Sequence, residues 1–463
     1  MTTYPLEPGR PEIEAMGQAA VGFVADFVEG LPRAPAVNVE GADHLAAELL
    51  RPPADEAGEF GALLEVFRRA AGRAVETAGP GYLAYIPGGG LVTSALAELL
   101  ARTVNRYTGL AGLAPALVAM EHGVVRWLCG RFGLPGTATG VVTTGGSIAT
   151  LSALVAARHD RLGDQFGDGT LYVTAHTHHC VAKAARIAGF PAARVRTVPT
   201  TSALRMDAAA ATRMIAADRA AGLRPFLLVG TAGTTDTGTI DPLGELGDLA
   251  RREGLWYHVD AAYSGFFQLT ARGQAKFAGI EAADSIALDP HKGLFLPYGT
   301  GVLLVRDAAP LRAAHAGEGH YLQDLAGGQR LPDYADLGPE LTREFRGLRL
   351  WLPLHLHGVG AFRDALDEKL DLAAHAHHAL AADPLLEVPW EPDLSVVVFR
   401  LRRGGDEGNQ RFLERINATK RIFLSSTRID GRYTPRLCVL GHRTHADHIA
   451  EALAIIRAAA RVT

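Results

Sequence analysis

The sequence has little cysteine, no excess of basic charge and no long uninterrupted apolar run. Only three cysteines occur in 463 residues, which argues against a disulfide framework and favours a reducing compartment. A formal net charge of −4 leaves no basic footprint for nucleic acid. Charged residues interrupt the most apolar windows before they reach a membrane span, and the first residues lack the pattern of a secretory signal. We therefore expect a cytoplasmic protein that binds neither nucleic acid nor membrane.

Short apolar runs alternate with helical patterns from about residue 140 onward. The runs are GVVTT, TLYVTA, PFLLVGT, LWYHVD, DSIALD and TGVLLV. This alternation predicts an α/β domain with a mainly parallel sheet covered by helices.

Helical patterns at 11–30 and 59–77 precede that region, and helical patterns follow it at 358–382, 408–419 and from about 445. Two strand-like runs, LSVVVFRL and RLCVL, lie among the later helices. We expect an N-terminal helical segment (1–80) too thin to fold alone, a large α/β domain (81–347) and a smaller C-terminal α+β domain (348–463).

Four groups of polar residues follow predicted strands, where ligands bind in parallel α/β sheets. The first is Gly145-Gly146-Ser147, after GVVTT and before a predicted helix. Two glycines allow an anion to approach the backbone, and a helix N-terminus offers free N–H groups. The sequence predicts a phosphate site, with a tight turn capped by Ser147 as the alternative.

The second group holds His176, His178, His179 and Cys180. These residues would suit zinc, but adjacent histidines cannot easily face one metal and no second ligand cluster is evident, so we expect no metal. One of the imidazoles is instead a candidate to lie flat on a planar ligand. Solvated loop histidines are the alternative.

The third and fourth groups centre on Asp260 and Lys292. Asp260 ends an apolar run and is followed by small residues, so it is expected to be a buried carboxylate that needs a partner, such as a protonated pyridine nitrogen. A helix cap or a structural ion pair is the alternative. Lys292 follows the run SIAL, where burial would lower its pKa and free the amine for imine formation.

The order of these groups, with the motifs HVDAAYSG and DPHKG, closely resembles the group II decarboxylases that use pyridoxal 5′-phosphate (PLP). That family includes decarboxylases of aromatic amino acids, glutamate and histidine. The resemblance implies fold type I, with a mainly parallel seven-stranded sheet, and a homodimer whose N-terminal segments wrap across subunits. It also implies a PLP Schiff base on Lys292, Asp260 on the pyridinium nitrogen and His178 stacked on the ring. The remaining cofactor contacts implied are Gly145, Gly146, Ser147, Thr235, Ala262 and His291.

The resemblance further implies a loop tyrosine that protonates the substrate carbon. Counting back from Phe345 without gaps gives Tyr334. The substrate-side candidates are Tyr85, Pro87 and Tyr107, which would suit an aromatic side chain. The reaction implied is decarboxylation of an L-amino acid, aromatic by our best interpretation, to its amine and CO2.

Two other functions remain open from the sequence. Some relatives within the resembled family carry out oxidative decarboxylation–deamination to an aldehyde, and the presence of Tyr334 favours the amine instead. A serine hydrolase is the remote alternative, because Ser147 sits on a predicted strand–turn–helix with Asp260 and His442 following in the required order.

Overall fold

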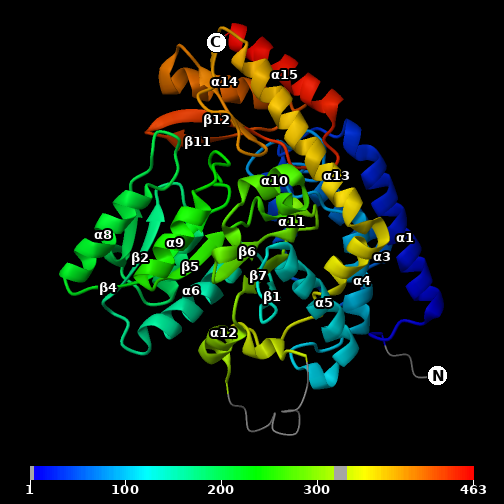
Figure 1. Ribbon diagram of the computed structural model, residues 1–463. Coiled ribbons are helices and arrows are strands. Elements are labelled where there is room, and N and C mark those ends of the chain that lie inside the picture. The colour runs from blue at the N-terminus through cyan, green and yellow to red at the C-terminus, as the bar shows by residue number, and fades with distance from the viewer. Residues whose placement is uncertain (1–4, 318–330, 463) are drawn as a thin grey trace.

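The computed structural model describes residues 5–317 and 331–462, and its centre is a seven-stranded sheet (Figure 1). The strand order is β1-β7-β6-β5-β4-β2-β3; β7 is antiparallel to both neighbours, and the other pairings are parallel. This confirms the predicted sheet. Along the chain the strands are β1 (Thr139–Thr143), β2 (Gly169–Thr174), β3 (Val195–Val198), β4 (Arg224–Thr231), β5 (Trp256–Asp260), β6 (Ser285–Leu288) and β7 (Gly301–Val305).

Helices cover both faces of this sheet because its strands are apolar on both sides. Consecutive residues of β1 show the alternation. Val141 packs into the core beneath α6 (Gly146–Leu162) and α7 (Cys180–Ile187). Val142 packs into the opposite core with α5 (Pro115–Arg131), α8 (Ala208–Ala220) and α9 (Leu243–Glu253). Val259 of β5 packs into the same core as Val142. The next residue, Asp260, therefore points its side chain to the opposite face of the sheet, where α6 lies. The sheet therefore delivers the Asp260 carboxylate beside the N-terminus of α6.

Fifteen α-helices lie within the described residues. Helix α13 holds a kink at Gly358, where the backbone leaves the helical conformation (φ 72°, ψ 152°). None of these helices is both long and apolar enough to cross a bilayer. Their bounds are α1 (Arg10–Gly30), α2 (Ala42–Leu49), α3 (Phe60–Ala71), α4 (Val92–Val104), α5 (Pro115–Arg131), α6 (Gly146–Leu162), α7 (Cys180–Ile187), α8 (Ala208–Ala220), α9 (Leu243–Glu253), α10 (Ala271–Lys276), α11 (Pro290–Gly293), α12 (Ala308–His315), α13 (Leu348–Ala381), α14 (Gly405–Ala418) and α15 (Ala446–Arg461).

The C-terminal part of the chain builds a separate small core. A three-stranded sheet in the order β11-β12-β9 and a two-stranded pair carry α14 and α15 (Figure 1). Leu83 joins this core from far away in the sequence: its N–H donates to Phe423 O (3.0 Å) and its carbonyl accepts from Cys438 N (2.9 Å). The strands are β8 (Leu386–Glu387), β9 (Val396–Val398), β10 (Arg400–Leu401), β11 (Ser425–Ile429) and β12 (Arg432–Cys438).

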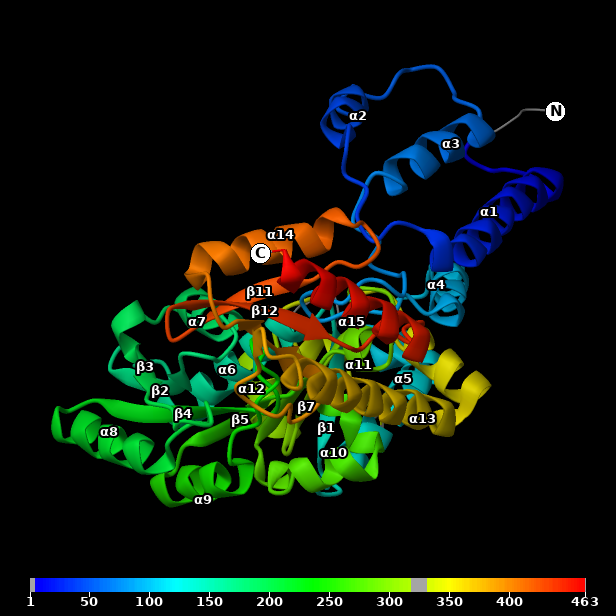
Figure 2. The same ribbon diagram turned by 90° about the horizontal axis from the view of Figure 1, so that it is seen from above.

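The first three helices make little contact with the rest of the chain. None of the residues of α1, α2 or α3 is buried, and Figure 2 shows α2 and α3 standing away from the body of the molecule. Apolar side chains of α1 and α4, with Phe60 of α3, line an open groove of about 1010 Å³. Amphipathic helices with an uncovered apolar face need a partner surface.

A buried ion pair fixes the chain that leads into α13. Arg343 Nη2 lies 2.7 Å from Glu121 Oε1 of α5, with 2% and 0% of the two side chains exposed. Arg343 and Arg346 also donate to the carbonyl of Val142 in β1, both at 3.2 Å. The segment before α13 is thereby attached to the edge of the central sheet.

We predict that Glu121→Gln lowers the free energy of unfolding by about 3–5 kcal/mol, because it leaves the Arg343 charge buried without an anion. Urea denaturation measures this effect. Glu14→Gln removes the partner of Arg10 in an exposed pair and should cost no more than about 0.5 kcal/mol. Equal losses of unfolding free energy in the two variants would show that the buried pair contributes no more to stability than the exposed pair, and would contradict the prediction.

Candidate active site

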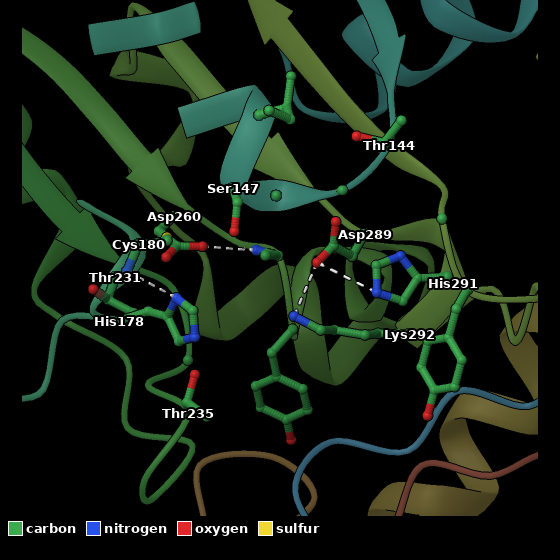
Figure 3. Close-up of a pocket in the computed structure, with 18 residues that line it drawn as sticks. Thr144, Ser147, His178, Cys180, Thr231, Thr235, Asp260, Asp289, His291 and Lys292 are labelled. Carbon is green, nitrogen blue, oxygen red and sulfur yellow. Dashed lines mark hydrogen bonds and ion pairs between the residues drawn. The ribbon is translucent and has the colours of Figure 1, made fainter. Parts of the chain in front are cut away.

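A cavity of about 340 Å³ opens where β4, β5 and β6 end and α6 begins (Figure 3). This volume lies within the range of small-ligand pockets. Its lining residues come from six separate stretches of the chain: Thr144, Gly145, Gly146, Ser147, Ile148, His178, Cys180, Thr231, Gly233, Thr235, Asp260, Ala262, Tyr263, Asp289, His291, Lys292, Tyr298 and Gly299.

The turn into α6 forms one wall of the cavity. Gly145 has φ 154° and ψ 170°, a conformation that side chains rarely allow. A Cβ on Gly146 would lie 3.0 Å from the Ala262 Cβ and 3.2 Å from Asp289 Oδ2, so glycine keeps this wall open. The 17-residue helix α6 directs its unpaired N–H groups at the cavity, and Ser147 adds a hydroxyl. This wall can hold an anion such as a phosphate.

Lys292 lies opposite, on the short helix α11, and its amine is paired with a carboxylate. Lys292 Nζ is 2.9 Å from Asp289 Oδ2. Burial disfavours the ammonium, but the charge and hydrogen bond of Asp289, with the charge of Asp260, more than offset it and raise the pKa of Lys292. The expected lowering of this pKa is therefore wrong, because Asp289 faces the amine.

Asp260 ends β5 as a buried carboxylate at the cavity wall. Its Oδ1 accepts from the N–H of Ala262 at 3.1 Å, which orients the carboxylate across the small residues that follow it. Figure 3 shows this contact and places Asp260 and Lys292 in the same cavity. A carboxylate in this place can hold a protonated ring nitrogen.

Of the two adjacent histidines, His178 lines the cavity and His179 is absent from its lining. His178 Nδ1 accepts from the backbone N–H of Cys180 (3.3 Å), so the proton of the neutral ring is on Nε2. Burial lowers the pKa of His178, which keeps this ring uncharged at neutral pH. His291 is also neutral because burial lowers its pKa, and its Nδ1–H donates to the carbonyl of Thr300 (2.7 Å).

Arg436 of β12 connects the C-terminal part of the chain to this cavity. Its guanidinium donates to Ser425 Oγ (3.1 Å), to the carbonyl of Asp236 (2.8 Å), to the carbonyl of Tyr85 (3.2 Å) and to the carbonyl of Thr235. Tyr85 itself has a left-handed backbone (φ 50°), which costs about 1–2 kcal/mol and needs such support. One buried arginine thus holds both the Thr235 loop and the Tyr85 segment.

The substrate-side candidates do not line the cavity. Tyr85 is 59% exposed, and Pro87 is buried outside the lining. Tyr107 donates its hydroxyl to the carbonyl of Leu341 (2.7 Å) and is also absent from the lining. Gly88 lies close to two residues of the cavity lining, since a Cβ there would come within 2.7 Å of the His291 carbonyl and 3.0 Å of the Tyr298 ring.

Tyr334 lies in the segment that joins α12 to α13, but its side chain is packed in the core and does not line the cavity. It is 1% exposed, belongs to the core on the α6 face, and has the Arg343 guanidinium 4.5 Å from its ring centroid. The count back from Phe345 assumed a loop of fixed length, whereas Tyr334 is held by packing and by this cation–π contact. Residues 318–330, which include Tyr321, are outside the described part of the chain.

The geometry does not bring together the serine-hydrolase site that the sequence left open. His442 is not in the cavity lining, and its ring lies 5.5 Å from that of Phe295, so Ser147 and Asp260 do not form a triad with it. Burial lowers the pKa of His442 to about 3. Within residues 5–317 and 331–462, no group of three His, Cys, Asp or Glu side chains is arranged to hold a metal ion.

The family of the chain follows from its sequence. A family profile described as "Pyridoxal-dependent decarboxylase conserved domain" matches residues 45–402. The chain belongs to the pyridoxal-dependent decarboxylase family. An aromatic-L-amino-acid decarboxylase of Bacillus atrophaeus is 29% identical over 98% of this chain and 97% of its own length.

Two solved structures are similar over nearly the whole decarboxylase. Oryza sativa TDC, crystallised with PLP and tryptamine, has a TM-score of 0.94 at 27% identity and covers 100% of this chain and 99% of its own. Rhodiola rosea 4-hydroxyphenylacetaldehyde synthase has a TM-score of 0.90 at 25% identity, with 98% and 99% covered. The decarboxylase is therefore a PLP-dependent enzyme of fold type I, which confirms the family, fold and cofactor that the motifs implied.

The cavity of the decarboxylase fits this cofactor. The glycine wall at α6 suits its phosphate, Lys292 offers an amine to its aldehyde, and Asp260 suits its ring nitrogen. Asp289 was not expected to have a role, although the motif DPHKG contains it. Its position three residues before Lys292, on a helical turn, could have indicated that the two side chains are paired.

We predict that Tyr334→Phe leaves the rate of CO2 release close to that of the wild type. The hydroxyl of Tyr334 is buried and has no hydrogen-bond partner within the described residues, so its removal should cost less than about 1 kcal/mol of stability. Steady-state kinetics and urea unfolding test this together. A large loss of CO2 release with unchanged stability would restore Tyr334 as a catalytic residue.

Proposed function

We propose that this enzyme decarboxylates an aromatic L-amino acid to the corresponding amine and CO2. The observation that carries the proposal is the convergence of Lys292, Asp260 and His178 on one cavity next to an anion-binding helix N-terminus. The aromatic assignment is supported by the similarity to an aromatic-L-amino-acid decarboxylase and to a structure that contains tryptamine.

In this proposal each residue has one task. When bound, PLP supplies a conjugated ring that accepts the electron pair left on Cα as CO2 departs. Asp260 keeps the ring nitrogen protonated, and its buried position strengthens that contact. His178 packs its neutral ring against the cofactor, and Lys292 exchanges its amine with that of the substrate.

The remaining contacts orient the bound groups. Gly145, Gly146 and Ser147 hold the phosphate with His291, and Thr235 lies near the cofactor oxygen or the substrate carboxylate. Ala262 leaves room beneath the ring, because a small side chain follows Asp260 there. All of these residues line the same cavity, which supports the assignment.

An aldehyde product is the second candidate, with a specific observation in its favour. The argument for the amine depended on Tyr334, and that side chain is buried away from the cavity. Rhodiola rosea 4-hydroxyphenylacetaldehyde synthase also shares the fold at 25% identity. The two reactions differ in consumption of oxygen and in release of ammonia and peroxide.

We also propose a homodimer formed through the N-terminal segment. Uncovered apolar side chains of α1 and α4 support it, among them Val21, Leu96, Leu99 and Leu100, which are 43% to 59% exposed. The division of the chain into an N-terminal segment (1–80), a large domain (81–347) and a smaller C-terminal domain (348–463) belongs to the same proposal.

We further propose a cytoplasmic location, consistent with three free, buried cysteines.

For the reaction, a panel of L-amino acids should give CO2 and amine in equal amounts, fastest with an aromatic substrate. Lys292→Ala should abolish borohydride trapping of the cofactor, because no other lysine lines the cavity in the described part of the chain. His178→Ala should lower kcat/KM roughly 100-fold, as misplaced reactants commonly do. His179→Ala is the matched control and should not.

Oxygen uptake that accompanies CO2 release would replace the amine by the aldehyde as product. Rapid turnover of a non-aromatic amino acid, with none of the aromatic ones consumed, would contradict the proposed substrate class. Equal losses in His178→Ala and His179→Ala would contradict the assignment of the stacked imidazole.

For the assembly, Leu99→Asp should convert the dimer to a monomer, because a charge in the groove opposes burial of its apolar surface. Sedimentation velocity measures the change. Leu385→Asp is the control, since Leu385 is similarly exposed (41%) but lies outside the groove. A dimer that survives Leu99→Asp would contradict the proposed interface.

A further inference from the structure

Asp289 is a buried carboxylate that local folding does not explain. It is 3% exposed, precedes the helix α11, and makes no side-chain cap on that helix. Its Oδ1 has no hydrogen-bond partner within the described residues. A buried anion left this incomplete is costly unless a nearby cation compensates it.

The compensating cation is Lys292. Asp289 Oδ2 lies 2.9 Å from Lys292 Nζ and 3.7 Å from His291 Nε2 (Figure 3). His291 is neutral, because burial lowers its pKa. Among the described residues that line the cavity, Lys292 is the one lysine and there is no arginine.

The other titratable groups around the amine come from neighbouring elements. Asp260 at the end of β5 adds a second negative charge, and Cys180 at the start of α7 and His178 before it face the same space. Burial raises the pKa of Cys180 to about 12 and lowers that of His178, so both are neutral near pH 7. The two carboxylates therefore dominate the field at the Lys292 amine.

We propose that Asp289 is a positioning residue for cofactor loading, which holds Lys292 as an ammonium ion until the amine loses a proton to solvent and so makes the rate of PLP uptake depend on pH. This inference uses the cofactor and does not depend on which amino acid the enzyme consumes.

The protons balance in this loading step. The Lys292 ammonium gives one proton to water, and the nitrogen lone pair then bonds to the aldehyde carbon as the C=O electrons move to oxygen. That oxygen takes one proton from the nitrogen and the other from solvent, and leaves as water. The nitrogen keeps its last proton in the new C=N bond, and Asp289 stays a carboxylate throughout.

The consequence is a pH-dependent rate of loading. A raised pKa means that only a small fraction of Lys292 is neutral at pH 7, and this fraction rises about tenfold for each pH unit below the pKa. Asp289→Asn removes the negative charge and lowers the pKa of the amine. At neutral pH the variant should therefore hold more neutral amine than the wild type.

The test follows uptake of PLP by the cofactor-free enzyme in a stopped-flow spectrometer, from the absorbance of the bound cofactor. The wild-type rate should rise about tenfold per pH unit between about pH 7 and pH 9. The rate for Asp289→Asn should be at least about tenfold higher at pH 7 and level off at lower pH. An unchanged rate and an unchanged pH profile would overturn the proposal.

A second arm separates the effect of Asp289 on the charge of the amine from repulsion of the phosphate. Pyridoxal, which has the aldehyde but no phosphate, should show the same shift of the pH profile in Asp289→Asn. Faster uptake of PLP by a constant factor at every pH, with pyridoxal unaffected, would mean that the carboxylate only repels phosphate, and the proposal would be wrong.

Asp284→Asn is the matched control. Asp284 lies directly before β6, whereas Asp289 lies directly after it, and the Asp284 carboxylate accepts from the N–H of Tyr257 (2.8 Å) instead of pairing with Lys292. It should load like the wild type, and a shift equal to that of Asp289→Asn would overturn the assignment.

The wild type also provides a test without substitution. Labelling of Lys292 by an amine-reactive reagent in the cofactor-free enzyme should titrate above the ordinary lysine pKa, and titration at or below it would refute the proposal.

Discussion

Parallel pairing of β4, β5 and β6 is the constraint on which the rest of the site depends. Because these strands run in one direction, their carboxyl ends meet at one edge of the sheet and bring Thr231, Asp260 and Asp289 together. Their side chains reach the cavity without long loops. The N-terminus of α6 then closes the same edge, since it follows a strand whose direction places that helix there.

The charges at this edge oppose one another within a few ångströms. The cavity lining holds two carboxylates and one lysine, with two histidines that burial keeps neutral. Such a set is expensive to bury and is poorly explained by stability alone. It is well suited to a cofactor that brings a phosphate, an aldehyde and a basic ring nitrogen, because each of these groups meets a complementary side chain.

Most of the central sheet could be predicted because its strands are buried on both faces and therefore appear as continuous apolar runs. Three strands were missed: β3, β8 and β11. The strand β8 has only two residues, and β3 and β11 lie at sheet edges and mix polar with half-buried residues. Their pairing is decided by a neighbouring strand and not by their own pattern. The helix expected at 59–77 ends at Ala71, because residues 74–76 instead pair with residues 36–38 in an antiparallel bridge.

The sequence by itself determined the family and the cofactor, since motifs such as HVDAAYSG and DPHKG join a side chain to a strand end. Only the tertiary structure decided which histidine faces the cavity, that Tyr334 is packed beneath Arg343, and that Lys292 is paired with Asp289. The physical reason is distance. Burial and the pKa of a side chain depend on groups a few ångströms away in space, and a linear pattern does not specify their separation.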